Sequence, residues 1–304
     1  MISIVDIKEN FRGEILINEL LSKYTSYRIG GPASLLLIPE DKTDAVNLSV
    51  YLQQNKIEFV IIGNGTNVLV SDNGIEGIVI NLEKGLNNIN KENNIVVAES
   101  GVMLARFVDF CIQNKFRGVE KLSGIPGTLG GAILMNASAF DCSISEFITE
   151  IEVVRNGEVI QVKKNESLFE YRNSGFKNDV ILSAKFDLPT GDSDEMMKIR
   201  HEYLQKRNQK QPLNYPNCGS VFKNPAGKHA AMLIESAGLK GLQVGDAQVS
   251  EKHGNFIVNL GRAKASDVVQ LMNRVRKVVF EKFGIVLEPE VKFIGFEKDV
   301  LDVL

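Results

Sequence analysis

The first 190 residues carry short apolar runs, many of them rich in valine and isoleucine, separated by turns that contain glycine and asparagine. Runs of this length and composition predict β-strands, which we place at 34–38, 59–62, 77–82, 95–99, 150–154 and 180–188. Two other segments have apolar residues at spacings of three and four. They predict helices over 43–54 and 102–114.

The pattern becomes helical after residue 190. Asp192 and Glu195 have the spacing of a capping box and predict the start of a charged helix that runs to about Gln209. A second helix is expected around 228–237.

The clearest amphipathic pattern predicts a third helix, which Ser266 caps and Gly284 ends. Strands come first and helices with a few strands follow, in place of alternating βαβ units. This order indicates an α+β protein with a domain boundary near residue 190.

Composition excludes several classes of protein. The chain has 304 residues, which predicts about two domains, and its 44% hydrophobic and 24% charged residues are ordinary for a globular protein. A net charge of −3 gives no electrostatic basis for nucleic-acid binding. No signal peptide and no run of 18 apolar residues is found, so no membrane partner is expected. Three scattered cysteines suggest a reducing cytoplasm, and three histidines without metal-ligand spacing predict no metal site.

Two glycine-rich segments are candidates for binding a phosphate group. In IIGNGTNVLV (61–70) a strand runs into Gly63-Asn64-Gly65, but the third glycine of the dinucleotide fingerprint is missing and no helix is expected to follow. LSGIPGTLGGAILMNASAF (122–140) lacks the G-K-[ST] of a P-loop. We expect each loop to follow a strand. Glycine lets backbone N–H groups approach a phosphate, so the pair favours a diphosphate cradle, with tight structural turns as the alternative.

Ser220 and Lys223 have the S-x-x-K spacing of acylating serine hydrolases. Asn224-Pro225 follows at once and disfavours the helix that this spacing needs, K-T-G is absent, and the S-D-N at 71–73 precedes the serine. Ser220 is therefore expected in a loop, as a neutral hydroxyl. It either bonds to the backbone or donates a proton to a strongly basic centre such as a carbanion.

Charged residues cluster in two further segments. Arg172 lies in EYRNSGFK between strand-like runs. Glu288, Glu290 and Lys292 are predicted on one face of an apolar strand over 286–295. A carboxylate in such a strand lies on an exposed edge or is paired at a site, and the residues alone favour the edge.

Together these segments resemble one known family, the UDP-N-acetylenolpyruvoylglucosamine reductases. The resemblance extends from about residue 20 to 296 and rests on eight motifs in the family's order and spacing. They are TSYRIGGPA (25–33), GNGTNVLVSDNG (63–74), SGIPGTLGGAILMNASA (123–139), YRNSGFK (171–177), NCGSVFKNP (217–225), AGLKG (237–241), HGNFIVN (253–259) and LEPEVKFIG (287–295).

The resemblance implies a vanillyl-alcohol-oxidase-type FAD-binding domain over 1–190, in lobes of about 1–86 and 87–190, and a substrate-binding domain over 191–304. It implies that the first three motifs hold FAD through Tyr27, Arg28, Ile29, Gly63, Asn64, Gly65, Thr66, Asn67, Ser123, Gly124, Pro126, Gly127, Thr128, Gly130, Gly131 and Asn136. Tyr171, Lys223 and Asn224 would contact the substrate. A monomer is expected.

The implied reaction is NADPH-dependent reduction of UDP-N-acetylglucosamine enolpyruvate to UDP-N-acetylmuramate, a step in peptidoglycan precursor synthesis. Hydride would pass from flavin N5 to the enolpyruvyl methylene carbon, leaving a carbanion or enolate at the neighbouring carbon. By its match to the family, Ser220 would protonate that carbon and Arg172 would stabilise the enolate charge. Glu290 would act near the substrate carboxylate. Such chemistry depends on charge placed in advance where the transition state needs it.

The sequence differs from many members of the family at two places. Lys292 stands where many members have arginine, and no insertion with a tyrosine lid occurs between Arg172 and Ser220.

Two other functions are alternatives to this interpretation. A flavin oxidase of the same fold would keep the glycine loops but has no reason to keep Ser220, Arg172 and Glu290 together. A non-catalytic UDP-sugar sensor would have lost at least one of these three residues.

Overall fold

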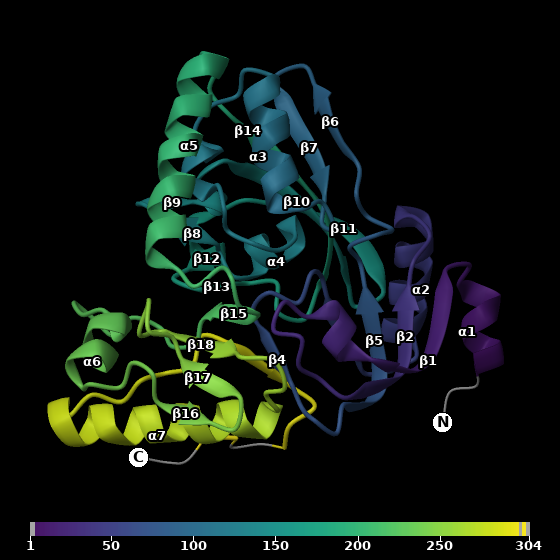
Figure 1. The fold of residues 1–304 in the computed structure, drawn as a ribbon. Helices are drawn as coiled ribbons and strands as arrows, with labels where there is room; N and C mark the ends of the chain where they lie inside the picture. The colour runs from purple at the N-terminus through teal and green to yellow at the C-terminus, as the bar shows by residue number, and fades with distance from the viewer. Residues whose placement is uncertain (1–3, 298–299, 302–304) are drawn as a thin grey trace. The chain divides into compact units, whose positions relative to one another are not determined.

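The computed structural model describes residues 4–297 and 300–301, which form two units (Figure 1). Unit 1 consists of Met1–Ile17, Leu35–Asn64 and Gly77–Gln205, and unit 2 of Asn18–Ser34, Gly65–Glu76 and Lys206–Leu304. Both units are discontinuous in sequence. Contacts between distant segments therefore hold each of them together.

Helices and strands are interspersed throughout both units. The α-helices are α1 (Ile4–Asn10), α2 (Lys42–Gln54), α3 (Leu104–Gln113), α4 (Leu129–Leu134), α5 (Ser193–Lys210), α6 (Ala230–Ser236) and α7 (Ala265–Phe283). Short 3-10 helices are η1 (Leu21–Tyr24), η2 (Val119–Leu122), η3 (Ile144–Glu146) and η4 (Glu166–Leu168).

Two sheets provide most of the framework of unit 1. The first has the order β1 (Glu14–Leu20), β2 (Pro32–Ile38), β5 (Ile75–Asn81), β3 (Phe59–Ile62), with β3 and β5 parallel. The second has the order β11 (Glu158–Lys163), β10 (Ile148–Arg155), β14 (Val180–Asp187), β7 (Ile95–Glu99), β6 (Ile89–Glu92), and its neighbouring strands are antiparallel. Two hairpins, β8 (Ser138–Ala139) with β9 (Cys142–Ser143) and β12 (Phe169–Glu170) with β13 (Asn173–Ser174), complete the unit.

Helices α2 and α3 each bury one apolar face in unit 1, as their spacing predicted. The α3 face joins a core with the inner residues of the second sheet, among them Phe107 and Phe186, whose ring centroids are 4.6 Å apart. Helix α2 contacts β10 and β14 and shares a second core with the first sheet. These two cores hold the segments between the strands, which carry several of the predicted site residues.

Unit 2 is built around a four-stranded antiparallel sheet. Its order is β15 (Asn217–Ser220), β18 (Phe256–Asn259), β17 (Ala247–Val249), β16 (Gln243–Val244). Helix α7 contacts β16 and β17 and packs its apolar stripe into the core of this unit (Figure 1). A separate parallel pair joins β4 (Val68–Val70) to β19 (Lys292–Ile294).

The start of α7 differs from the prediction. Its N-cap is Lys264, and Ser266 lies in the first turn. The backbone N–H groups of Ala265 and Ser266 donate to the carboxylate of Asp72 at 2.7 and 3.0 Å. A carboxylate distant in sequence thus satisfies donors that a local cap would normally satisfy. The predicted end is correct, because Gly284 is left-handed with φ 66°.

The α+β class and the six predicted strands are confirmed, but three local predictions are wrong. The segment before Lys292 is not a strand, since Phe222 and Pro289 form only an isolated bridge. The second glycine segment follows η2 in place of a strand and contains α4. Ser220 ends the short strand β15 and so does not lie in a loop.

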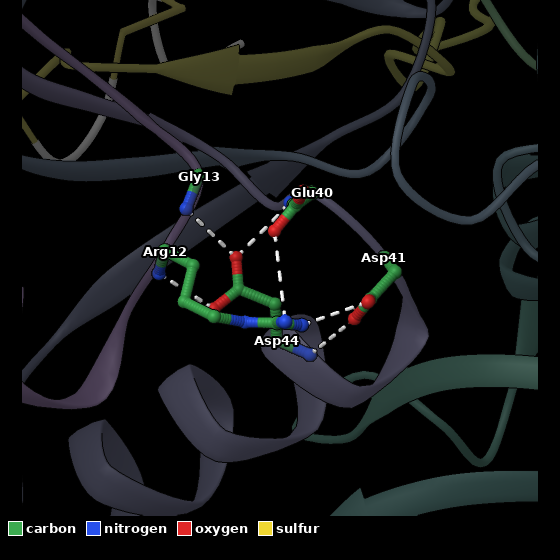
Figure 2. Close-up of polar contacts among 5 residues, drawn as sticks. All are labelled: Arg12, Gly13, Glu40, Asp41 and Asp44. Carbon is green, nitrogen blue, oxygen red and sulfur yellow. Dashed lines mark hydrogen bonds and ion pairs between the residues drawn. The ribbon is translucent and has the colours of Figure 1, made fainter.

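A buried carboxylate fixes the start of α2 in unit 1 (Figure 2). Asp44 is 1% exposed, and its oxygens accept hydrogen bonds from the backbone N–H groups of Arg12, Gly13 and Glu40 at 2.8, 3.0 and 3.0 Å. Asp41 caps the helix by accepting from the Asp44 N–H at 2.8 Å, and it also pairs with the Arg12 guanidinium at 2.7 Å. Asp44 therefore joins α2 to the segment before β1.

We expect Asp44→Ala to lower the free energy of unfolding by about 3 kcal/mol, because three backbone donors lose a charged acceptor and a buried unsatisfied donor costs about 1–3 kcal/mol. Urea denaturation measures the loss. Glu40→Gln is the matched control, because this exposed carboxylate lies 3.7 Å from Arg12 and an exposed ion pair contributes little. Equal midpoints for Asp44→Ala and the unsubstituted protein would contradict the prediction.

Candidate functional site

The two glycine-rich segments meet within unit 1. A Cβ added at Gly63 would lie 2.2 Å from the Thr128 hydroxyl oxygen, so only glycine allows this approach. The Asn81 side chain donates to the Gly63 carbonyl at 3.2 Å, and the Asn64 amide donates to Glu83 at 3.1 Å. The end of β3 is therefore held against the loop that precedes α4. This closeness is what a cradle for one phosphate-bearing ligand requires.

The second segment carries two buried polar side-chain atoms that a ligand can bind. Within residues 4–297, the Ser123 hydroxyl oxygen is buried and makes no hydrogen bond, and the same holds for the Asn136 side-chain oxygen. Gly124 and Gly127 have φ values of 81° and 115°, which favour glycine. A buried polar atom is normally paired, so a ligand that supplies polar groups fits this segment.

The segment that carries Tyr27, Arg28 and Ile29 lies beside the second half of the first glycine loop, within unit 2. The Ser26 N–H donates to the Gly65 carbonyl at 3.1 Å, and a Cβ at Gly65 would lie 2.2 Å from the Tyr24 carbonyl oxygen. The Asn259 side chain donates to the Tyr27 carbonyl at 3.1 Å. Residues 24–26 therefore pack against Gly65, and the side chains of Tyr27 and Ile29 are buried in the core of unit 2.

Arg172 lies at the turn of the β12–β13 hairpin in unit 1. Its φ of 58° is unusual for a residue with a Cβ. The guanidinium donates from Nη1 to the Ser138 hydroxyl at 3.0 Å and lies 5.2 Å from the ring centroid of Tyr171. The Asn136 amide donates to the Glu170 carbonyl at 3.1 Å, so three predicted site residues, Asn136, Tyr171 and Arg172, are close together.

The structure brings Ser220 and Glu290 into neighbouring segments of unit 2. The Glu290 N–H donates to the Val221 carbonyl at 2.9 Å. The Asn67 side chain donates to the Glu290 carbonyl at 3.3 Å, and the Lys292 N–H donates to the Asn67 carbonyl at 3.0 Å. A predicted flavin-loop residue is thus bonded to the segment of the predicted catalytic glutamate.

Glu288 has a role that the sequence did not indicate. Its carboxylate forms an ion pair with the Lys223 ammonium at 3.0 Å, and its carbonyl accepts from the Lys223 N–H at 2.9 Å. Spacing alone could not find this pair, because the two residues lie 65 positions apart. The backbone hydrogen bond fixes Lys223, the predicted substrate contact, next to Glu288, and the ion pair between the two exposed side chains adds little.

Cys218 lies two residues before Ser220 and is not a competing nucleophile. Burial raises the pKa of its thiol to about 12, and the nearby charge of Glu290 adds to the rise. The thiol is therefore protonated at neutral pH, whereas nucleophilic attack needs the thiolate.

Two family models match this chain. An FAD-binding domain matches residues 33–163, and the C-terminal domain of UDP-N-acetylenolpyruvoylglucosamine reductase matches 211–294. The reductase from Caldanaerobacter subterraneus subsp. tengcongensis is 43% identical over 286 residues, which are 93% of this chain and 94% of the relative. The chain belongs to the UDP-N-acetylenolpyruvoylglucosamine reductase family.

Further relatives agree with this assignment. The reductase of that name from Pediococcus pentosaceus is 43% identical over 94% of this chain and 96% of its own length. The crystal structure of the reductase from Thermus caldophilus superposes with a TM-score of 0.79 at 31% identity, covering 93% of this chain and 99% of that one. The family resemblance predicted from eight motifs is confirmed, as is the FAD-binding domain.

The predicted site residues are divided between the units of this family member. Unit 1 holds Gly63, Asn64, the segment 123–136 and Arg172, whereas unit 2 holds Tyr27 to Ile29, Gly65 to Asn67, Ser220, Lys223, Asn224 and Glu290. Convergence of Arg172 with Ser220 and Glu290 stays a prediction.

The described residues contain neither a metal-binding cluster nor a membrane-spanning helix. Among residues 4–297 and 300–301, no group of three or more His, Cys, Asp or Glu side chains has the geometry to hold a metal ion. No helix in that part of the chain has both the length and the apolar composition needed to cross a bilayer.

Proposed function

We propose that this chain catalyses the reaction that gives its family its name, the NADPH-dependent reduction of UDP-N-acetylglucosamine enolpyruvate to UDP-N-acetylmuramate. The observation that carries the proposal is the bonding within unit 2, which links Asn67 of the flavin loop to Glu290 and Glu290 to the strand end at Ser220. Residues 1–190 would bind FAD, and 191–304 would bind the substrate.

FAD fits the glycine segments of this chain. The buried Ser123 hydroxyl and Asn136 oxygen offer hydrogen bonds to a ligand, and the close approach of Gly63 to Thr128 brings the two glycine segments together. The residues that would hold FAD are the sixteen predicted from Tyr27 to Asn136. When bound and reduced by NADPH, FAD supplies a hydride to the enolpyruvyl methylene carbon.

The chain's own residues would complete the reaction. Hydride addition leaves an electron pair at the carbon beside the substrate carboxylate, delocalised as an enolate. The Arg172 guanidinium would stabilise that charge, since a fixed cation in a dry site lowers such barriers strongly. Ser220 would donate its hydroxyl proton to the carbon, which closes the balance of one hydride and one proton added across the double bond.

The substrate's anionic groups need cations. Lys223 would contact phosphate or carboxylate, and the hydrogen bond from its N–H to the Glu288 carbonyl fixes its backbone before the substrate arrives. Tyr171, which is 53% exposed, and Asn224 would complete the substrate contacts. Glu290 would act near the substrate carboxylate.

A spectrum of the purified protein tests the proposal. We expect an absorbance band near 450 nm that NADPH bleaches under anaerobic conditions and that the enolpyruvyl nucleotide restores with formation of UDP-N-acetylmuramate. The expected flavin content is one FAD per chain, and a monomer is expected in light scattering.

Each alternative function gives a different spectrum. A flavin oxidase would be reoxidised by oxygen but not by the enolpyruvyl nucleotide. A sensor would bind the nucleotide without any flavin turnover. Either result would overturn the proposed reaction.

A further inference from the structure

We infer that Ser138 is a positioning residue, which fixes the guanidinium of Arg172 for its role in the proposed reaction. The inference rests on the proposed function, because it assigns Ser138 an effect only on the step in which Arg172 stabilises negative charge. It depends on a contact within unit 1, the hydrogen bond from Arg172 Nη1 to the Ser138 hydroxyl at 3.0 Å.

Ser138 belongs to a set of three contacts that joins residues 134–138 to the β12–β13 hairpin. The Ser174 hydroxyl donates to the Leu134 carbonyl at 3.0 Å, and the Asn136 amide donates to the Glu170 carbonyl at 3.1 Å. The first joins a side chain of the hairpin to the backbone of α4, and the second joins a side chain to the backbone of the hairpin. Of the three, the Ser138 contact is the one made to the guanidinium of Arg172.

The side chain of Arg172 needs such a contact. Arginine has many rotamers, and fixing a long side chain costs about 1.5–2 kcal/mol of conformational entropy. Arg172 lies at a turn with φ 58°, so the backbone fixes the position of its Cβ but not that of its guanidinium. The ring of Tyr171, whose centroid lies 5.2 Å from the guanidinium, is itself 53% exposed and gives no directional contact. Ser138 supplies a directional acceptor at the far end of the side chain.

Ser138 follows closely in the chain after residues that would hold FAD. The segment runs from the second glycine loop through α4 into Asn136 and Ser138 without a break, and α4 contacts β13. A short rigid path therefore connects the residues that would hold FAD to the acceptor of Arg172. Positions held by packed elements are set more precisely than positions on free loops.

The test is Ser138→Ala in the FAD-loaded protein, followed by stopped flow. We expect reoxidation of the reduced enzyme by saturating enolpyruvyl nucleotide to slow about tenfold, because a hydrogen bond to a charged group is lost. We expect changes of less than about twofold in the rate of reduction by NADPH, in the flavin content and in the calorimetric Kd of the nucleotide for the oxidised protein. The thermal midpoint should shift by no more than a few degrees. Ser138→Thr keeps the hydroxyl and should restore most of the rate.

A double-mutant cycle separates positioning from a general structural effect. In an Arg172→Ala background, Ser138→Ala should change the reoxidation rate by less than about twofold, since the group it positions is gone. An unchanged rate in the single Ser138→Ala variant would overturn the inference, and so would a tenfold loss that persists in the Arg172→Ala background. If the unsubstituted protein is not reoxidised by the nucleotide at all, the proposed function fails first and this inference falls with it.

Discussion

Ser220→Ala is expected to slow reoxidation of the reduced flavin by the enolpyruvyl nucleotide by at least about 10²-fold. General acids typically contribute about 10²–10⁴-fold, which sets the size of the expected loss. Cys218 is the nearest thiol in sequence, but it is buried in the apolar core of unit 2, so it does not replace Ser220 as the donor. Stopped-flow absorbance near 450 nm measures both half-reactions separately.

Reduction of the flavin by NADPH should survive in Ser220→Ala, because no carbanion forms in that half-reaction. Ser236→Ala is the matched control, since Ser236 is an exposed serine at the end of α6 in the same unit. A normal reoxidation rate in Ser220→Ala would refute the proton-donor assignment and leave Ser220 with the backbone hydrogen bond that was the alternative from the sequence. Loss of both half-reactions would instead indicate a damaged fold.

The regular elements of this protein could be predicted from local pattern. The apolar faces of α2 and α3 follow helical periodicity, because each helix buries one face in a core. Short apolar runs likewise predicted six strands, namely β2, β3, β5, β7, β10 and β14. The end of α7 was equally predictable, since Gly284 adopts the left-handed conformation that local sequence specifies.

What the sequence could not show depends on partners distant in the chain. Ser266 looked like the cap of α7, but the N-cap is Lys264. The first N–H groups of the helix bond to Asp72, almost two hundred residues earlier. Glu288 and Glu290 looked like residues of an edge strand, yet their segment pairs with the backbone of 221–223 instead. In both cases a tertiary contact replaces the local interaction that the pattern suggested.

In the candidate site, too, some features could be predicted from local sequence and others depend on residues distant in the chain. Glycine content alone suggested a ligand cradle, and the contact between Gly63 and Thr128 gives it a physical basis. Roles for individual polar residues came only from the family resemblance, because a serine or arginine in a turn has ordinary structural uses. The contact of Ser138 with Arg172 required coordinates, since no spacing rule connects the two positions.

Arg172→Ala is expected to slow the same reoxidation step by about 10²–10³-fold, the usual cost of removing one donor that stabilises an oxyanion. The calorimetric Kd of the nucleotide for the oxidised protein should change much less, because the enolate charge exists only during the reaction. Arg172→Lys should recover part of the rate, since it keeps the positive charge but lacks the planar fork of donors. All three residues carry a Cβ, so the strained backbone at φ 58° is comparable among them.

Arg106→Ala is the control for loss of a positive charge from unit 1, because Arg106 is exposed and donates to the carbonyl of Asn87, which is not a predicted site residue, at 2.6 Å. It should leave both half-reactions unchanged. If Arg172→Ala weakens nucleotide binding as strongly as it slows reoxidation, the guanidinium serves ground-state binding rather than the developing charge. If it slows neither, Arg172 is a turn residue whose contacts with Ser138 and Tyr171 are structural, and the charge of the enolate must be met by another group.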